Sequence, residues 1–270
     1  MSAVAAQRAG NTALNRIRSI GRAELLLFWR NRTALFNALL LPVAIVGVVS
    51  LANVNGDGES SSNAVLMTGL LGFVLLGVVY YNLVSTYVAR REELVLKRLR
   101  VGEITDVEIL IGTASPTIAV AVAQIVLFIV GGSVFLGLPV PVNAPVLALG
   151  VLGGAGVFVI LAAASSTFTR TVEMAQITTL PVLAACMLGS GLVFPLELLP
   201  EAVASVLRFL PLTPAVDLMR LGWVGTTGEA TPKDFVGVLG AAAAPALILA
   251  AWTALGGMAV RRYFRWEPRR

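Results

Sequence analysis

The stretch FPLELLPEAVASVLRFLPLTPAVDLMR, residues 194–220, decides the topology of this chain. It is apolar enough to enter a membrane, yet it contains four prolines, three acidic side chains and two arginines. Proline interrupts helices, and charged side chains are costly in lipid. The stretch therefore crosses a bilayer, lies on its surface or folds back into it, and the remaining sequence decides between these arrangements.

The composition is that of an integral membrane protein. Of the 270 residues, 57% are hydrophobic and only 13% are charged, with a mean hydropathy of +0.86, whereas about 25% of the residues of a soluble domain are charged. Apolar runs without Asp, Glu, Lys or Arg are each long enough for a span of about 20 residues. We expect one all-α transmembrane domain over residues 1–270, because helices satisfy their own backbone in lipid. The six runs are 33–52, 64–88, 109–136, 144–168, 175–194 and 236–258.

The basic residues predict the orientation of these spans, since Lys and Arg stay on the cytoplasmic side. With the N-terminus inside, 17 of the 20 basic residues are cytoplasmic: those before residue 33, in the loop 89–108, at Arg170 and after residue 260. The basic region before the first run is too long for a cleaved signal peptide, so we expect the first span to be retained. Both termini are then cytoplasmic, which requires an even number of crossings.

Residues 195–223 are therefore predicted not to cross. Pro200 and Pro211 bracket about ten residues, which as a helix rise about 15 Å, half of a bilayer core. A second short helix follows, with Thr213 as its cap, Pro214 at its first position, and Asp217 paired with Arg220 at i,i+3. We expect either an outer re-entrant hairpin that covers a pathway or a surface amphipathic helix without a gating role. The gate residues would be Pro195, Pro200, Glu201, Leu210, Pro211, Thr213, Pro214, Asp217 and Arg220.

The loop 89–108 predicts a docking element. Glu93 and Lys97 stand at i,i+4, and leucines form an apolar patch among the charges. A short charged helix with such a patch suits a groove on a cytosolic protein, while the alternative is ordinary basic decoration of an inner loop. The candidate contact residues are Arg90, Arg91, Glu92, Glu93, Leu94, Lys97, Arg98, Leu99 and Arg100.

The two chain ends carry further basic residues. Residues 11–30 place apolar residues and Gly21 near one face, with Arg18 and Arg22 opposite, which is typical of an interfacial helix in the headgroup plane of membrane lipid. A plain basic anchor is the alternative. The tail RRYFRWEPRR, residues 261–270, is interpreted as simple anchoring.

The missing residue types argue against chemistry within this chain. There is no histidine and only one cysteine, Cys186, so neither a metal site nor a disulfide is predicted. Neither lysine follows a glycine-rich loop, which excludes a phosphate-binding P-loop. The arginines lie at the edges of apolar runs rather than in a nucleic-acid-binding patch. We expect no catalytic, cofactor-binding or metal residue, and an energy source outside these helices.

Two motifs resemble a known family. The charged loop RREELVLKRLR follows the second span, and the pattern Leu199-Pro200, Leu210-Pro211-Leu212-Thr213-Pro214 and Asp217-x-x-Arg220 precedes the last. Together with the six spans, they are similar to the permease subunit of ABC-2 type exporters. The lysine-poor, alanine-, valine- and arginine-rich composition is most similar to drug-resistance permeases of actinobacteria.

This resemblance implies a bacterial inner-membrane exporter of an amphipathic drug, polyketide or lipid. It implies a second permease copy, identical or a paralogue, and a separate cytosolic ABC ATPase subunit that holds ATP and Mg. The coupling helix would be 90–100 and the exit cap 195–223, while the short TFTRTVEM at 167–174 matches no second coupling sequence. The alternatives are a channel or secondary transporter without an ATPase, and a membrane scaffold that transports nothing.

Overall fold

The computed structural model describes residues 60–101, 104–190, 201–227, 231–264 and 266, with a few positions between 15 and 51. All regular elements in these ranges are helical, which confirms the all-α part of the predicted fold class. Within the described residues, five helices are long and apolar enough to cross a membrane. The first predicted run, 33–52, lies mostly outside the described residues, and the described positions within it are helical. The candidate spans are Leu66–Glu92, Asp106–Phe135, Ala144–Phe168, Val172–Gly189 and Phe235–Tyr263.

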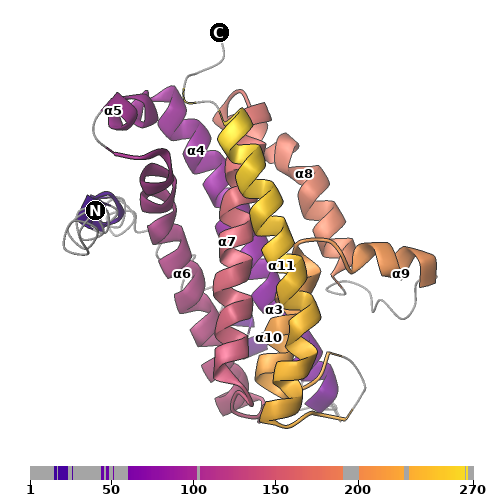
Figure 1. The fold of residues 1–270 in the computed structure, drawn as a ribbon. Helices are drawn as coiled ribbons and strands as arrows, with labels where there is room; N and C mark the ends of the chain where they lie inside the picture. The colour runs from indigo at the N-terminus through magenta and orange to yellow at the C-terminus, as the bar shows by residue number, and fades with distance from the viewer. Residues whose placement is uncertain are drawn as a thin grey trace, which may run out of the picture.

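The long helices lie roughly side by side, with α7 among α4, α6, α10 and α11 (Figure 1). Helix α5 lies across one end of this bundle, and α9 projects from its side. Helices α7 and α10 contribute most to the core, and the other helices of the bundle contribute the rest. The elements are α3 (Ser60–Val74), η1 (Leu75–Tyr81), α4 (Asn82–Glu92), α5 (Val95–Val101), α6 (Asp106–Phe135), α7 (Ala144–Phe168), α8 (Val172–Gly189), α9 (Glu201–Leu207), α10 (Leu212–Val224) and α11 (Phe235–Tyr263).

The second span differs from a plain α-helix. Seven of its residues, Leu75–Tyr81, form the π-helix η1 between α3 and α4. The flanking residues Val74 and Asn82 keep right-handed helical angles, so the chain continues without a break. Within η1 the Tyr80 hydroxyl lies 2.9 Å from the Ser165 hydroxyl on α7. The wide turn is thereby fixed against the centre of the bundle.

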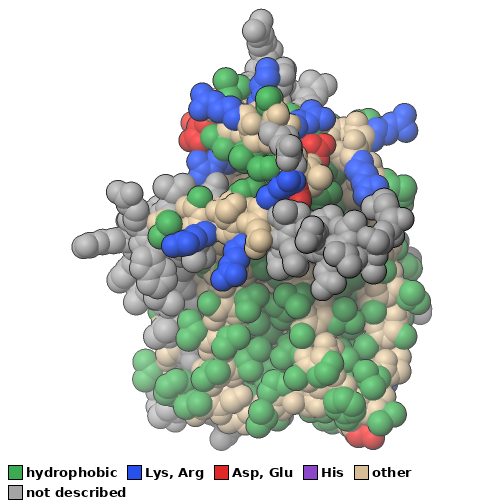
Figure 2. All heavy atoms as spheres, turned by 60° about the vertical axis from the view of Figure 1, so that its left-hand side comes forward, with side chains coloured by type: hydrophobic (Ala, Val, Ile, Leu, Met, Phe, Trp, Pro, Cys, Tyr) green, Lys and Arg blue, Asp and Glu red, His purple; other side chains and the backbone are tan. Residues whose placement is uncertain are grey.

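The two ends of the bundle differ in charge. Figure 2 shows Lys and Arg side chains gathered toward the end that carries α5, above a broad apolar surface. We call this the basic end, and the end at the 136–143 loop the opposite end. At the opposite end Asn143 joins two helices, because its Oδ1 accepts from Val146 N of α7 at 3.1 Å and its Nδ2 donates to Phe235 O of α11 at 3.1 Å.

Helix α10 packs against half of α7. The contacts pair Gly222 with Leu147, Gly150 with Met219, and Ala215 with Gly154, so the helices are antiparallel. Thirteen helical residues rise about 20 Å, and backbone hydrogen bonds from Val142 N and Asn143 N reach the C-terminal turn of α10. Helix α10 therefore starts well inside the bundle and ends at the opposite end.

The glycine at the closest point of this contact gives a direct test. A Cβ at Gly222 would lie 2.6 Å from Leu147 Cα, where backbone rather than a flexible side chain must move. We expect Gly222→Ala to destabilise the purified protein by about 1–3 kcal/mol, the usual cost of overpacking, measured by thermal unfolding in detergent. Gly240→Ala on α11 is the matched control, since nothing lies within 4 Å of its Cβ position. Equal stability of the two variants would contradict the packing described.

Candidate functional site

Between α4 and α5 the chain makes a sharp turn at Glu93 and Leu94, at the basic end. We call this turn, with the helix ends that flank it, the α4–α5 corner. Helix α4 ends at Glu92 and α5 begins at Val95, so the single helix expected over 90–100 is wrong. Leu94 has a positive φ of 61°, which is uncommon for a residue with a Cβ. Glu93 pairs with Arg90 at 2.9 Å. The helix break is the reason why the predicted i,i+4 spacing of Glu93 and Lys97 does not describe one helical face.

The predicted contact residues divide into an exposed set and a supporting set. Leu94 lies at the tip of the corner with 40% of its surface exposed. Arg90 and Leu99 are half-buried, and Arg91 is 1% exposed. Arg91 therefore does not face a partner directly, contrary to the expectation for it. The exposed residues of the predicted set are Glu92, Glu93, Leu94, Lys97, Arg98 and Arg100.

The chain tail packs against the buried side of α5. Leu96 and Ile109 are buried with Trp266, and Phe264 packs against this cluster. The Phe264 and Trp266 rings meet edge to face with centroids 4.8 Å apart. The Arg100 guanidinium lies 5.0 Å from the Trp266 ring centroid. The interpretation of the tail as simple anchoring was wrong for these two aromatic residues, which pack directly under the corner.

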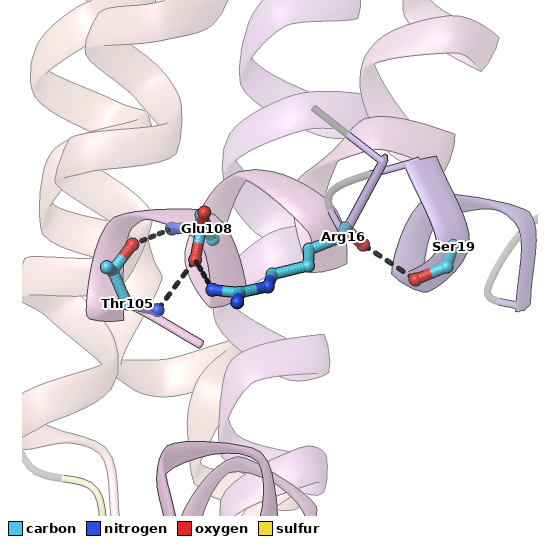
Figure 3. A network of polar contacts seen from close by, with 4 residues as sticks. All are labelled: Arg16, Ser19, Thr105 and Glu108. Atoms are coloured by element: carbon cyan, nitrogen blue, oxygen red, sulfur yellow. Dashed lines mark hydrogen bonds and ion pairs between the residues drawn. The ribbon is translucent and has the colours of Figure 1, made fainter. Parts of the chain in front are cut away.

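The start of α6 is held by a capping box (Figure 3). Thr105 N donates to Glu108 Oε2 at 2.7 Å, and Glu108 N donates to Thr105 Oγ1 at 3.3 Å. The same Glu108 oxygen lies 3.9 Å from Arg16 Nη1. Ser19 Oγ donates to Arg16 O at 2.8 Å one turn later. These contacts join the N-terminal region to the start of α6 at a single carboxylate.

The N-terminal helical residues cross α6 at small side chains. A Cβ at Gly112 would lie 2.9 Å from Ile20 Cβ, and Gly21 is buried beside Ser115. Arg18 and Arg22 are exposed. Of the predicted apolar face of residues 11–30 only Gly21 is described, and it is buried, whereas Leu14, Ile17, Leu25 and Phe28 lie outside the described residues. The sequence had not indicated the contact with α6.

The inner side of α4 is tied to two neighbouring helices. The Tyr87 hydroxyl donates to Leu110 O of α6 at 3.0 Å. Arg91 Nη1 donates to Ser166 O at 2.8 Å, and its Nη2 donates to Thr169 O. Ser166 lies in the last turn of α7 and Thr169 is its C-cap residue. A displacement of the corner would therefore also move α6 and the end of α7.

Thr213, one of the predicted gate residues, lies at the junction of α8, α9 and α10. The Thr213 hydroxyl lies 3.0 Å from both Gly189 O at the end of α8 and Leu207 O at the end of α9. The expectation that Thr213 caps α10 was wrong, because the N-cap is Pro211 and Pro214 is the third helical residue. The Thr213 hydroxyl instead shares its single proton between one carbonyl oxygen of α8 and one of α9, and the residue is buried in the junction.

The remaining gate residues are distributed along α9 and α10. Arg220 donates from Nε to Thr68 Oγ1 of α3 and from Nη1 to Thr227 O, both at 3.1 Å. Asp217 is half-buried one turn before Arg220 and within its electrostatic influence. Glu201 begins α9, Leu210 is half-buried, and Pro211 and Pro214 are buried. Pro195 and Pro200 lie outside the described residues.

Some supporting residues had recognisable sequence signatures. Thr105 followed by Glu108 is a capping box before an apolar run, and Asn143 with a proline two residues on is a helix start. In contrast, the contacts of Arg91 and Trp266 join segments far apart in the chain. No local spacing identifies them.

The described residues contain no cluster of three potential metal-ligating side chains. A family model described as ABC-2 type transporter matches residues 15–223, which includes the corner, α6 to α9 and nearly all of α10. No curated protein shows significant similarity to the chain.

The capping box and the ion pair at Glu108 can be separated by substitution. Glu108→Gln keeps an oxygen acceptor for Thr105 N but removes the charge beside Arg16, whereas Glu108→Ala removes both. We expect Glu108→Ala to raise amide exchange at the start of α6, because it removes one of the two hydrogen bonds of the capping box, and Glu108→Gln to raise it less, because partly exposed ion pairs contribute little. Amide hydrogen exchange at residues 106–112 measures both, and equal effects would show that the ion pair dominates.

The left-handed residue at the corner gives a further test. Glycine adopts a positive φ without steric cost, so Leu94→Gly relieves strain of about 1 kcal/mol. We expect its thermal unfolding midpoint to equal or exceed that of the unchanged protein. Leu94→Val places a β-branched side chain at the same φ and should lower the midpoint. The reverse order would contradict the turn geometry.

Proposed function

Because the chain belongs to the ABC-2 type transporter family, we propose that it is the transmembrane subunit of an ATP-driven exporter for amphipathic or lipophilic compounds. Members of this family are the membrane component of ABC transporters, which work with an ABC ATPase subunit and are not themselves catalytic. Energy would then come from ATP and Mg bound by a separate cytosolic subunit. The chain itself contributes the path and the surface that receives the motion.

The observation that carries this proposal is the α4–α5 corner. It presents an exposed leucine among acidic and basic side chains, a composition suited to a protein surface rather than to lipid alone. It is also supported on its inner side, by Tyr87, Arg91 and Trp266. An exposed surface on a rigid support transmits force, whereas a loosely attached loop would absorb it. We assign this corner as the coupling contact.

The distribution of charge supports the orientation. The basic end carries the corner and the end of α11, and 17 of the 20 basic residues of the sequence belong to this side in the predicted topology. By the positive-inside rule this end faces the cytoplasm. The chain would then be a six-span protein of a bacterial inner membrane, with residues 33–52 as the first span and both termini inside.

Helices α9 and α10 suit an exit gate. Helix α10 starts inside the bundle and ends at the opposite end, which is the outer end in this orientation. Irregular backbone at membrane depth persists only where protein or water covers it, and Thr213 and Trp252 provide such cover. Trp252 Nε1 on α11 donates to Phe209 O between α9 and α10 at 2.7 Å. We propose that 195–223 forms the outer re-entrant hairpin.

The apolar character of the spans indicates the class of substrate. The predicted runs contain no charged residue, so a path lined by them favours drugs, polyketides or lipids over ions. Outward-facing apolar side chains such as Val126, Ile177 and Leu247 leave α6, α8 and α11 with large surfaces for membrane lipid and for a second permease copy.

Substitution at the tip of the corner tests the proposal. Leu94→Asp places a charge where an apolar side chain would enter the ATPase groove, and we expect ATPase affinity to fall by about tenfold or more, the value of one buried leucine. The test partner is a separate cytosolic ABC ATPase subunit from the same genome, and co-purification is the measurement. Val140→Asp, an exposed apolar position at the opposite end, is the control.

The result separates the proposed function from its alternatives. ATPase capture that is unchanged in Leu94→Asp contradicts the coupling assignment. Transport of a fluorescent phospholipid analogue in proteoliposomes without any ATPase would indicate a channel or secondary transporter. ATPase binding without ATP-dependent transport of that lipid or of a lipophilic dye would indicate a scaffold.

A further inference from the structure

Arg91 joins the corner to the loop between α7 and α8. The residue is 1% exposed, and its guanidinium reaches Ser166 O and Thr169 O from the last turn of α4. The planar guanidinium presents parallel N–H donors in a fixed geometry, so one side chain holds two carbonyl groups of the same helix end. Arg91 lies two residues before the exposed turn at Glu93 and Leu94.

The carbonyl groups that Arg91 binds would otherwise lack partners. The last four carbonyl groups of a helix have no intrahelical donor. At the end of α7, Ser165 O accepts from Thr169 Oγ1 at 3.0 Å, and Ser166 O accepts from Arg91. A positive charge is also favourable at a helix C-terminus, where the helix dipole is negative. The end of α7 is thus completed by a residue of another span.

The loop that follows is too short to absorb movement. Only Thr169, Arg170 and Thr171 separate α7 from α8. Thr169 is held by Arg91, and Thr171 Oγ1 accepts from Met174 N in the first turn of α8. A displacement of Thr169 must therefore move the start of α8 together with the end of α7.

We propose that Arg91 is a positioning residue that clamps the α7–α8 loop to the coupling corner, so that one ATPase contact drives α7 and α8 as well as α4 and α6. This inference rests on the proposed function, because the motion originates in the ATPase. It explains how TFTRTVEM takes part in coupling although it lacks a coupling sequence of its own. Arg91 acts through the loop and not on the ATPase or the substrate.

The clamp itself is tested on the full chain alone. Arg91→Met keeps the length of the side chain but donates no hydrogen bond, and Arg91→Lys donates from one nitrogen only. We expect amide exchange in residues 165–176 to rise by about tenfold or more in Arg91→Met, since hydrogen bonds to charged groups are the stronger class, and by less in Arg91→Lys. Arg170→Met removes an exposed charge from the same loop and should leave exchange unchanged. Unchanged exchange in Arg91→Met overturns the clamp.

Transmission is tested with two spin labels in the complex with the ATPase. Cys186 is the only cysteine, so a Cys186→Ala background permits single labels at Val101 on α5 and at Ile177 on α8, both of which are exposed. In the labelled Cys186→Ala protein that retains Arg91, addition of ATP with vanadate should change the spin-label spectra at both positions. In Arg91→Met the Val101 label should still respond, while the response at Ile177 falls by about fivefold or more and is partly restored in Arg91→Lys.

The outcomes distinguish the inference from its premise. A full response at Ile177 in Arg91→Met overturns the transmission role of Arg91. A silent label at Val101 in the otherwise unchanged chain refutes the proposed coupling function, and the exchange experiment then still tests the clamp. If Arg91→Met does not fold, Arg91→Lys must show the smaller loss at Ile177 with Val101 unaffected, and equal losses at both positions count against the inference.

Discussion

The structure depends on one constraint: a helix that ends inside or at the edge of a bilayer must find partners for its terminal backbone groups within the protein. Several described helix ends meet it with a side chain from another segment. Asn143 joins the starts of α7 and α11, and Thr213 accommodates the ends of α8 and α9. Arg91 completes α7 from α4. The polar contacts that satisfy the backbone are therefore the same contacts that connect the helices mechanically.

Close backbone approach provides the second level of organisation. Without a hydrophobic driving force between helices in lipid, association depends on packing, and small residues permit the nearest contacts. In this chain Gly150, Gly154 and Gly222 bring α10 against α7, while Gly21 and Gly112 bring the N-terminal region against α6. The first contact lies toward the opposite end and the second lies at the basic end. At the opposite end, the short helix α10 thus packs tightly against α7. At the basic end, the N-terminal region packs across the start of α6.

Much of the architecture could be predicted from the sequence, because apolar runs indicate the helices that cross lipid and basic loops indicate the cytoplasmic side. The bounds of α7 agree with the run 144–168, and the docking loop falls on the α4–α5 corner. What could not be predicted depended on tertiary contacts. Thr213 resembles a helix cap in sequence, yet its hydroxyl binds carbonyl groups of α8 and α9. Trp266 resembles an interfacial anchor, yet it is buried under α5. In both cases local propensity was overridden by a partner distant in the chain.

The π-helix η1 has a consequence for sequence variation along the second span. A π-turn contains one residue more than an α-turn, because its hydrogen bonds run from i to i+5. A homologue that lacks one residue in 75–81 would tighten this turn and leave the faces of α3 and α4 in place, whereas the same deletion in α7 would rotate every later side chain away from its neighbours. Insertions and deletions of one residue among relatives should therefore concentrate beside Tyr80, because the π-turn there contains one residue more than an α-turn needs.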